Sequence, residues 1–191
     1  MSQENYTMSS QEVRLQSTVS GFTATGKLHT LSVWFILALR LMIGLAFFQS
    51  GFDKVLSGSF SAAGYLQNAP PANGSPVADL FVAMGNTPWF VDFVDVAVPW
   101  GEVLIGLGLI FGVLTRLAAF WGAFMMLLFY LGNWDIAHGY INGDFAYMLV
   151  FLAVAAFGAG RILGLDAYIE QYEIDGRPLV ERYPWSRYLL G

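Results

Sequence analysis

Three residues on one apolar stretch, Asp95, Pro99 and Glu102, have the spacing needed to place polar chemistry inside a membrane. They occupy positions i, i+4 and i+7 of residues 91–114, a run long and apolar enough to cross a bilayer as one helix. With a rise of about 1.5 Å per residue, Glu102 falls roughly halfway through about 30 Å of hydrocarbon. A carboxylate at that depth costs about 2.5 kcal/mol or more, so it must face protein or water.

Arg40 is the natural partner for Glu102, because it lies near the centre of another apolar run, residues 31–52. The two helices run antiparallel, so their charges can lie at matching depths. An unpaired ion would be far more costly, and we therefore expect an Arg40–Glu102 ion pair inside the protein.

Lys54 and Asp95 fit a second ion pair poorly. Lys54 lies 14 residues beyond Arg40, about 21 Å along a helix, whereas Asp95 and Glu102 are about 10 Å apart. We expect Lys54 to meet Asp92 or Asp144 near the outer interface instead.

The buried charges allow three interpretations. They can be a structural lock that fixes helix register. They can line a pocket for the headgroup of a quinone, whose ring is apolar but whose carbonyls need hydrogen-bond donors, with Glu102 handling protons. They can also belong to a solute pathway. For the quinone site, the candidate catalytic residues are Glu102 and Arg40, and the candidate binding residues are Arg40, Glu102, Trp100, Asp95 and Lys54. Trp100 either forms an aromatic wall of that site or faces lipid.

The composition is typical of a membrane protein and excludes several chemistries. Of 191 residues, 56% are hydrophobic and 12% charged, and the net charge of −5 argues against nucleic-acid binding. The chain has no cysteine, so it forms no disulfide or thiolate metal site. The histidines, His29 and His138, are expected on opposite sides of the membrane. We therefore expect no metal, haem, flavin or nucleotide on this chain.

Four apolar segments predict an all-α integral membrane protein, a bundle of four transmembrane helices. The segments are residues 31–52, 91–114, 117–132 and 145–163. Only Thr115 and Arg116 separate the second from the third, which predicts a tight hairpin. Together with the residues that lead into it, the bundle forms a membrane domain, 29–163, between a flexible polar tail, 1–28, and a C-terminal extension, 164–191.

A long outer loop of about forty residues joins the first two spans. It contains two short amphipathic pieces, residues 61–66 and 77–84, on either side of proline-containing turns. We expect these pieces to lie on the membrane surface as a cap, and the extension to fold back on the opposite surface.

The basic residues predict the orientation in the plasma membrane. Lys54 is the single basic residue on the outer side, so both termini should be cytoplasmic. The acidic, lysine-poor composition is typical of a salt-loving, archaeal source, although membrane proteins of other organisms can share it. On the expected cytoplasmic side lie Arg14, Lys27, Arg116, Arg161, Arg177, Arg182 and Arg187.

Six short motifs occur in order along about residues 33–168. They are Arg40-Leu-Met-Ile-Gly44, Gly51-Phe-Asp-Lys54, Ser61-Ala-Ala-Gly-Tyr65, Pro99-Trp-Gly-Glu102, Leu114-Thr-Arg116-Leu-Ala and Gly158-Ala-Gly-Arg161. In this order and spacing they resemble the DoxX/DoxD family of small four-span membrane proteins, and most closely its DoxD branch.

The resemblance implies a redox subunit of a terminal quinol oxidase or a thiosulfate:quinone oxidoreductase. Such a chain would work with a second, DoxA-like subunit and pass electrons into the quinone of the lipid bilayer. It would bind quinone as its cofactor and could form a homo-oligomer. Other DoxX-like proteins are thought to be membrane scaffolds for redox enzymes, so a non-enzymatic assembly subunit stays open. A small-solute channel or carrier is the third alternative, which the lack of an inverted repeat weakens.

Overall fold

The computed structural model describes residues 14–19, 22–27, 30–134, 139–174 and 176–191. The chain divides into two units, Met1–Phe35 and Ile36–Gly191. In the first unit, strands β1 (Arg14–Val19) and β2 (Phe22–Lys27) pair as an antiparallel hairpin within the predicted polar tail. The expectations for His29 and His138 lie outside the described residues.

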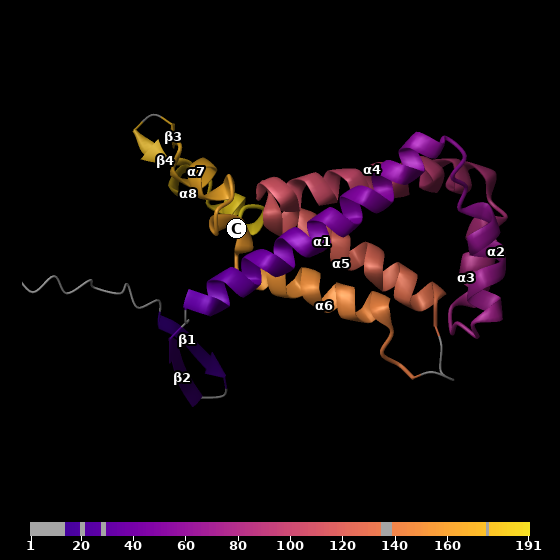
Figure 1. The fold of residues 1–191 in the computed structure, drawn as a ribbon, viewed down its shortest axis with the longest axis horizontal. Helices are drawn as coiled ribbons and strands as arrows, with labels where there is room; N and C mark the ends of the chain where they lie inside the picture. The colour runs from indigo at the N-terminus through magenta and orange to yellow at the C-terminus, as the bar shows by residue number, and fades with distance from the viewer. Residues whose placement is uncertain (1–13, 20–21, 28–29, 135–138, 175) are drawn as a thin grey trace, which may run out of the picture. The chain divides into compact units, whose positions relative to one another are not determined.

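Three helices are long and apolar enough to cross a membrane. They are α1 (Thr30–Ser57), α4 (Pro88–Phe111) and α5 (Thr115–Gly132), with 28, 24 and 18 residues. Figure 1 shows α4 and α5 joined by a short turn, as predicted, but the turn is formed by residues 112–114, and the predicted link, Thr115 and Arg116, begins α5. Gly112 closes α4 in the left-handed conformation, with φ 66°, so the chain reverses at once.

The fourth predicted span, residues 145–163, is not one continuous helix. Helix α6 (Gly143–Ala156) has 14 residues, about 21 Å, which is short of a 30 Å hydrocarbon core. Gly158 has φ 59°, which ends the helix, and a 3₁₀ turn, η1 (Ala159–Arg161), follows. Helix α6 packs along α5, where Gly122 leaves room for the ring of Phe151, which is fully buried.

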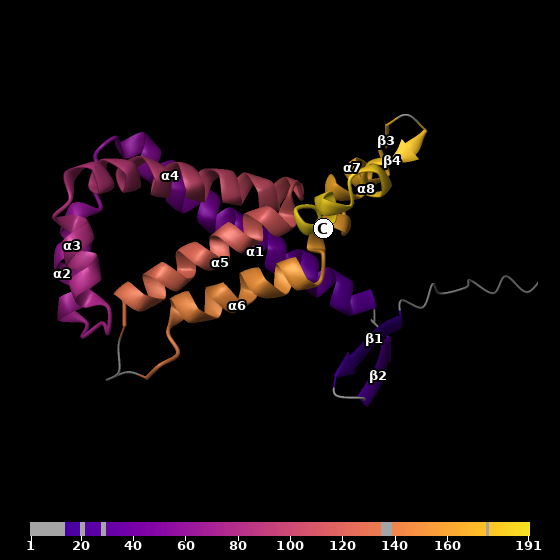
Figure 2. The same ribbon diagram turned by 180° about the vertical axis from the view of Figure 1, so that it is seen from behind.

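The segment between α1 and α4 forms two short helices, α2 (Ala63–Ala72) and α3 (Ala78–Gly85). Helix α2 continues through Pro70 and Pro71, where the sequence predicted a turn. Both prolines lie in its last turn, and because they have no N–H group, two helical hydrogen bonds are missing there. Figures 1 and 2 show α2 and α3 side by side at the end of the helices where α1 ends and α4 begins. Their shared apolar contacts include Ala62, Leu66 and Phe81.

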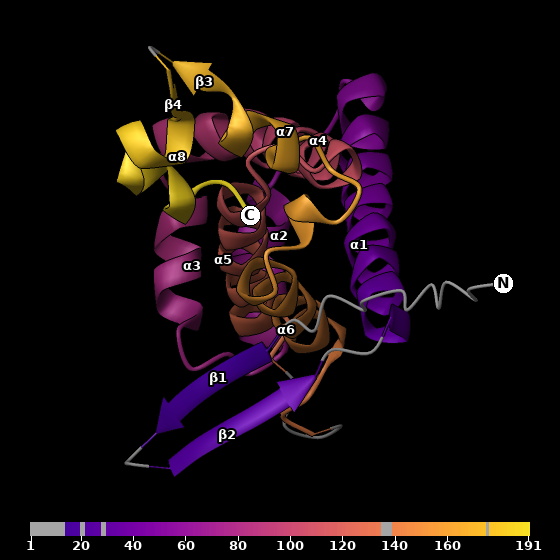
Figure 3. The same ribbon diagram turned by 90° about the vertical axis from the view of Figure 1, so that its left-hand side faces the viewer.

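The C-terminal extension lies at the other end of the helices, where α4 ends and α5 begins (Figures 1 and 3). Its last residues are held there, since Leu189 O accepts a hydrogen bond from Leu117 N at 3.2 Å and Leu190 is buried. Its elements are α7 (Asp166–Gln171), β3 (Glu173–Ile174), β4 (Arg177–Pro178), α8 (Leu179–Arg182) and the 3₁₀ helix η2 (Pro184–Tyr188).

Candidate functional site

Glycines set the register between α1 and α4. A Cβ on Gly51 would lie 2.6 Å from Pro99 O and 2.7 Å from Glu102 Cβ. On the other helix, a Cβ on Gly106 would lie 2.5 Å from the backbone nitrogen of Phe48. Small residues let helix backbones approach this closely. Glu102 is therefore level with Gly51, about 16 Å along α1 from Arg40.

Glu102 forms its ion pair with Lys54, which lies three residues beyond Gly51. The Lys54 Nζ is 2.6 Å from each carboxylate oxygen. Glu102 is 3% exposed, whereas the Lys54 side chain keeps 26% of its surface. Lys54 also donates to Ser50 Oγ at 3.1 Å and lies 5.5 Å from the centre of the Phe60 ring. The carboxylate of Glu102 is therefore buried, whereas the side chain of Lys54 remains partly accessible from outside the protein.

The predicted Arg40–Glu102 ion pair is wrong. Arg40 Nη1 donates to Ala159 O at 2.5 Å and Ile162 O at 2.8 Å, and Nη2 donates to Leu163 O at 3.3 Å. These carbonyls belong to the turn after α6. Arg40 is 1% exposed, and Gly112 at the end of α4 also lies close to its guanidinium. The expected pairing of Lys54 with Asp92 or Asp144 is also wrong, because Glu102 holds its ammonium group.

Asp166 is the acidic residue that acts electrostatically on Arg40. It is fully buried, and its carboxylate accepts hydrogen bonds from Leu114 N at 2.8 Å, Thr115 N at 2.9 Å and Gly191 N at 3.1 Å. Two of these bonds satisfy backbone donors at the start of α5 and favour a negative charge there. This role of Asp166 was not predicted from the sequence, where the signal for it is an acidic residue shortly after an apolar segment.

The remaining predicted site residues lie apart from one another. Asp95 accepts a hydrogen bond from Ala62 N at 2.6 Å, which fixes the start of α2 on α4. Trp100 is 52% exposed. Asp95 therefore supports the start of α2, and Trp100 presents about half of its surface outward.

A chain of hydrogen bonds joins α2 to the end of α5 and the start of α6. Tyr65 Oη donates to Asn133 Oδ1 at 2.9 Å, and Asn133 Nδ2 donates to Asp144 Oδ2 at 2.8 Å. Burial, and then the charge of Asp144, raise the pKa of Tyr65 to about 12. Tyr65 therefore stays a neutral donor that ties α2 down over this end. Among the described residues, no three histidine, cysteine or acidic side chains gather to hold a metal.

The long apolar helices and their polar pair define a helical, multi-pass membrane protein. The family model for DoxX matches residues 35–134, just over half of the chain, and the chain belongs to the DoxX family. The match contains both Lys54 and Glu102 but not the carbonyls that bind Arg40. A search of curated proteins and a search of solved structures each found no match.

Proposed function

We propose that this protein is a membrane redox subunit that binds quinone at the Lys54–Glu102 pair. The observation that supports the proposal is the pair itself, a buried carboxylate whose cationic partner keeps 26% of its side-chain surface. Paired ions inside membrane helices commonly mark substrate or proton pathways. The quinone ring would lie against apolar helix surface while one carbonyl accepts a hydrogen bond from Lys54.

Glu102 is proposed to handle the protons of the reaction. Reduction of a quinone to the quinol takes up two electrons and two protons, and each proton forms an O–H bond. In the proposal the electrons come from thiosulfate, of which two molecules are oxidised to tetrathionate, or from a partner redox protein. In this scheme Glu102 carries each proton only briefly. The ammonium group of Lys54, 2.6 Å away, is close enough to exchange a proton with it.

Arg40 takes a different role in this proposal from the one its sequence position predicted. Its guanidinium donates to three carbonyls and is enclosed, so it is left with no approach to a quinone headgroup. We assign it to positioning, where it holds the turn after α6 against α1.

We also propose that α6 makes a fourth crossing. It begins beside the end of α5, where Asn142 Nδ2 donates to Asn133 O at 3.2 Å. It ends beside the start of α5, where Arg116 Nε donates to Ala155 O at 3.3 Å. Helix α6 therefore runs antiparallel to α5, from the level at which α5 ends to the level at which α5 begins. Four crossings would place the residues before α1 and those after α6 on one side, which the excess of arginine predicts to be cytoplasmic.

The second candidate function is a non-enzymatic scaffold for a redox complex. Its supporting observation is that both cations already have partners within this chain, Arg40 through the carbonyls bound by its two Nη atoms and Lys54 through Glu102. A purely structural lock needs no more than that.

Direct quinone binding separates the two functions. The purified protein in lipid nanodiscs is titrated with a short-chain quinone, and binding is followed by quenching of tryptophan fluorescence. Glu102→Gln and Lys54→Met should each weaken binding at least about tenfold, because each removes a polar contact worth about 1.4 kcal/mol or more. Asp92→Asn, an exposed acid on the same helix, is the control and should bind normally.

Catalysis is then tested in washed membranes, in which the natural partner proteins of the chain are present. Thiosulfate-dependent quinone reduction by washed membranes should fall in Glu102→Gln and persist in Asp92→Asn. Quinone binding that is equal in all variants, or absent from the native protein, would favour the scaffold.

A further inference from the structure

The last 3₁₀ helix is fixed rigidly to the membrane helices. Arg116 Nη1 donates to Arg187 O at 2.7 Å, and Leu117 N donates to Leu189 O at 3.2 Å. Ser186 and Leu190 point inward, with 5% and 2% of their surface exposed. The backbone of η2 is therefore held against the first turn of α5.

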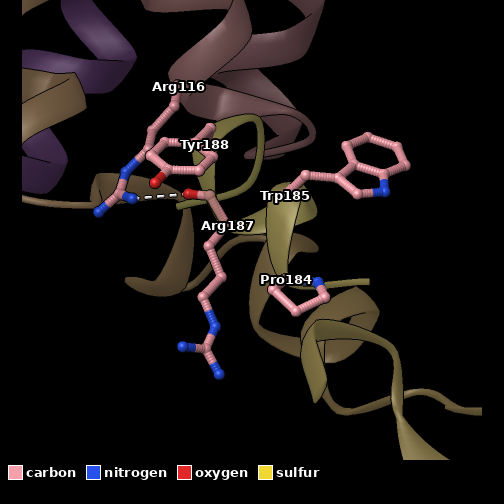
Figure 4. A pocket seen from close by; sticks show the side chains of 5 residues that line it. All are labelled: Arg116, Pro184, Trp185, Arg187 and Tyr188. Atoms are coloured by element: carbon pink, nitrogen blue, oxygen red, sulfur yellow. Dashed lines mark hydrogen bonds between the residues drawn. The ribbon is translucent and has the colours of Figure 1, made fainter. Parts of the chain in front are cut away.

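The other side chains of η2 form an outward surface, the η2 surface, made of Pro184, Trp185, Arg187 and Tyr188. With Arg116, they line a pocket that contains two arginines and no acid (Figure 4). Trp185 is 60% exposed and Tyr188 81%. Figure 4 shows the guanidinium of Arg187 pointing away from Arg116, so its charge is presented outward. Because the backbone of η2 is fixed, the fold itself holds Trp185 and Tyr188 on the surface.

The position of Arg116 places the η2 surface at the membrane boundary. Arg116 is the second residue of α5, which is long and apolar enough to cross a bilayer. The start of such a helix lies in the headgroup layer, where tryptophan, tyrosine and basic residues are enriched. Leu163, in the turn after α6, and Tyr168, in α7, are 75% and 77% exposed. Apolar exposure on this scale is costly in water and favourable in the interface.

From these observations we propose that the η2 surface binds an anionic phospholipid, with Arg187 as the phosphate contact. Trp185 and Tyr188 lie beside the glycerol and upper acyl region, and Arg116 positions the backbone that carries them. A free phosphate would gain nothing from the two aromatic rings. The inference is independent of quinone binding, because the pocket at the η2 surface contains neither Lys54 nor Glu102.

The test uses brominated lipids, which quench nearby tryptophan. Nanodiscs of phosphatidylcholine receive increasing brominated phosphatidylglycerol or, in parallel, brominated phosphatidylcholine. The chain has six tryptophans, so the signal of Trp185 is taken as the difference between the native protein and Trp185→Phe. We expect phosphatidylglycerol to quench Trp185 at lower mole fraction than phosphatidylcholine.

Arg187→Gln should weaken the apparent affinity for phosphatidylglycerol about fivefold, and Arg187→Lys should retain most of it. The hydrogen bond from Arg116 involves the backbone of Arg187, so these variants keep the fold, which melting temperatures check. Arg177→Gln, an exposed arginine on β4, is the matched control and should behave as the native protein.

Several results would overturn the proposal. Equal quenching by the two lipids would show that no anionic headgroup is preferred. An equal loss in Arg187→Gln and Arg177→Gln would show a diffuse charge effect. Loss of the preference on adding inorganic phosphate would assign the surface to a soluble anion, and absence of Trp185 quenching by either lipid would place it away from the membrane.

Discussion

The ammonium group of Lys54 lies 2.6 Å from both carboxylate oxygens of Glu102, across 48 residues of sequence. This contact joins α1 to α4 at the point where Gly51 lets the two backbones approach. Arg40, on the same helix as Lys54, belongs to a separate network with the turn after α6. Among the described residues, Arg40 and Glu102 therefore belong to two separate polar networks rather than to the single one that was predicted for them.

Breaking the Lys54–Glu102 pair should destabilise the protein by about 2 kcal/mol, less than a fully buried pair because Lys54 is partly exposed. Lys54→Met leaves Glu102 buried without a counter-ion, and Glu102→Gln leaves Lys54 without one. The double variant should lose less than the sum of the two, which a double-mutant cycle of denaturant unfolding measures. Strict additivity would contradict direct pairing.

Arg40 and Glu102 should behave as independent residues. The effects of Arg40→Leu and Glu102→Gln on the free energy of unfolding should add to within about 0.5 kcal/mol. Arg40 and Asp166 serve as the positive control, since their electrostatic interaction should make Arg40→Leu and Asp166→Asn non-additive. A coupling free energy between Arg40 and Glu102 as large as that of the control pair would show that the two residues belong to one network.

Gly51→Ala should push α1 away from α4, because its Cβ has no room beside Pro99 and Glu102. Overpacking of this kind costs about 1–3 kcal/mol and should weaken quinone binding with it. Gly64→Ala is the matched control. Gly64 lies in α2 with nothing within 4 Å of an added Cβ, so alanine there should be neutral or stabilising. Thermal unfolding in detergent compares them, and equal melting temperatures would argue against the close helix contact.

Tyr65 should titrate at about 12, above its ordinary value of 10.0. Below pH 10.0 the hydroxyl is protonated in the folded and the unfolded chain, so its contribution to stability is complete. As the pH rises to about 12 the unfolded chain loses its proton first, and stability falls. The tyrosinate absorbance of the native protein minus that of Tyr65→Phe follows this one group. A titration midpoint near the ordinary pKa of 10.0 would show that the Tyr65 hydroxyl is not buried beside Asn133 and Asp144.

The number of crossings can be counted with single cysteines, because the chain has none of its own. Ser59→Cys lies just after α1, and Tyr172→Cys lies on the exposed surface of the extension. If α6 crosses the membrane, a membrane-impermeant maleimide should label Ser59→Cys in intact cells and Tyr172→Cys only after lysis. Labelling of both in intact cells would mean three crossings and opposite sides for the termini.

The sequence by itself determined the class of protein and the identity of its polar residues. Apolar runs of spanning length, the tight turn before α5 and the buried Glu102 follow from hydropathy and spacing, which are local properties. Family membership also follows from short motifs along the chain. The short helices α2 and α3 could be predicted because amphipathic pieces flank proline-containing turns, although the position of those prolines inside α2 could not.

Only the tertiary structure decided which charges meet. Depths counted from the ends of apolar runs placed Arg40 and Glu102 together, but α1 continues to Ser57 and its glycine contacts with α4 shift the register. That shift brings Lys54, not Arg40, to Glu102. The partners of Arg40 are backbone carbonyls in the turn that follows α6, and carbonyls carry no sequence signature. Close packing between distant segments sets such contacts, so they are visible only once the helices are in place.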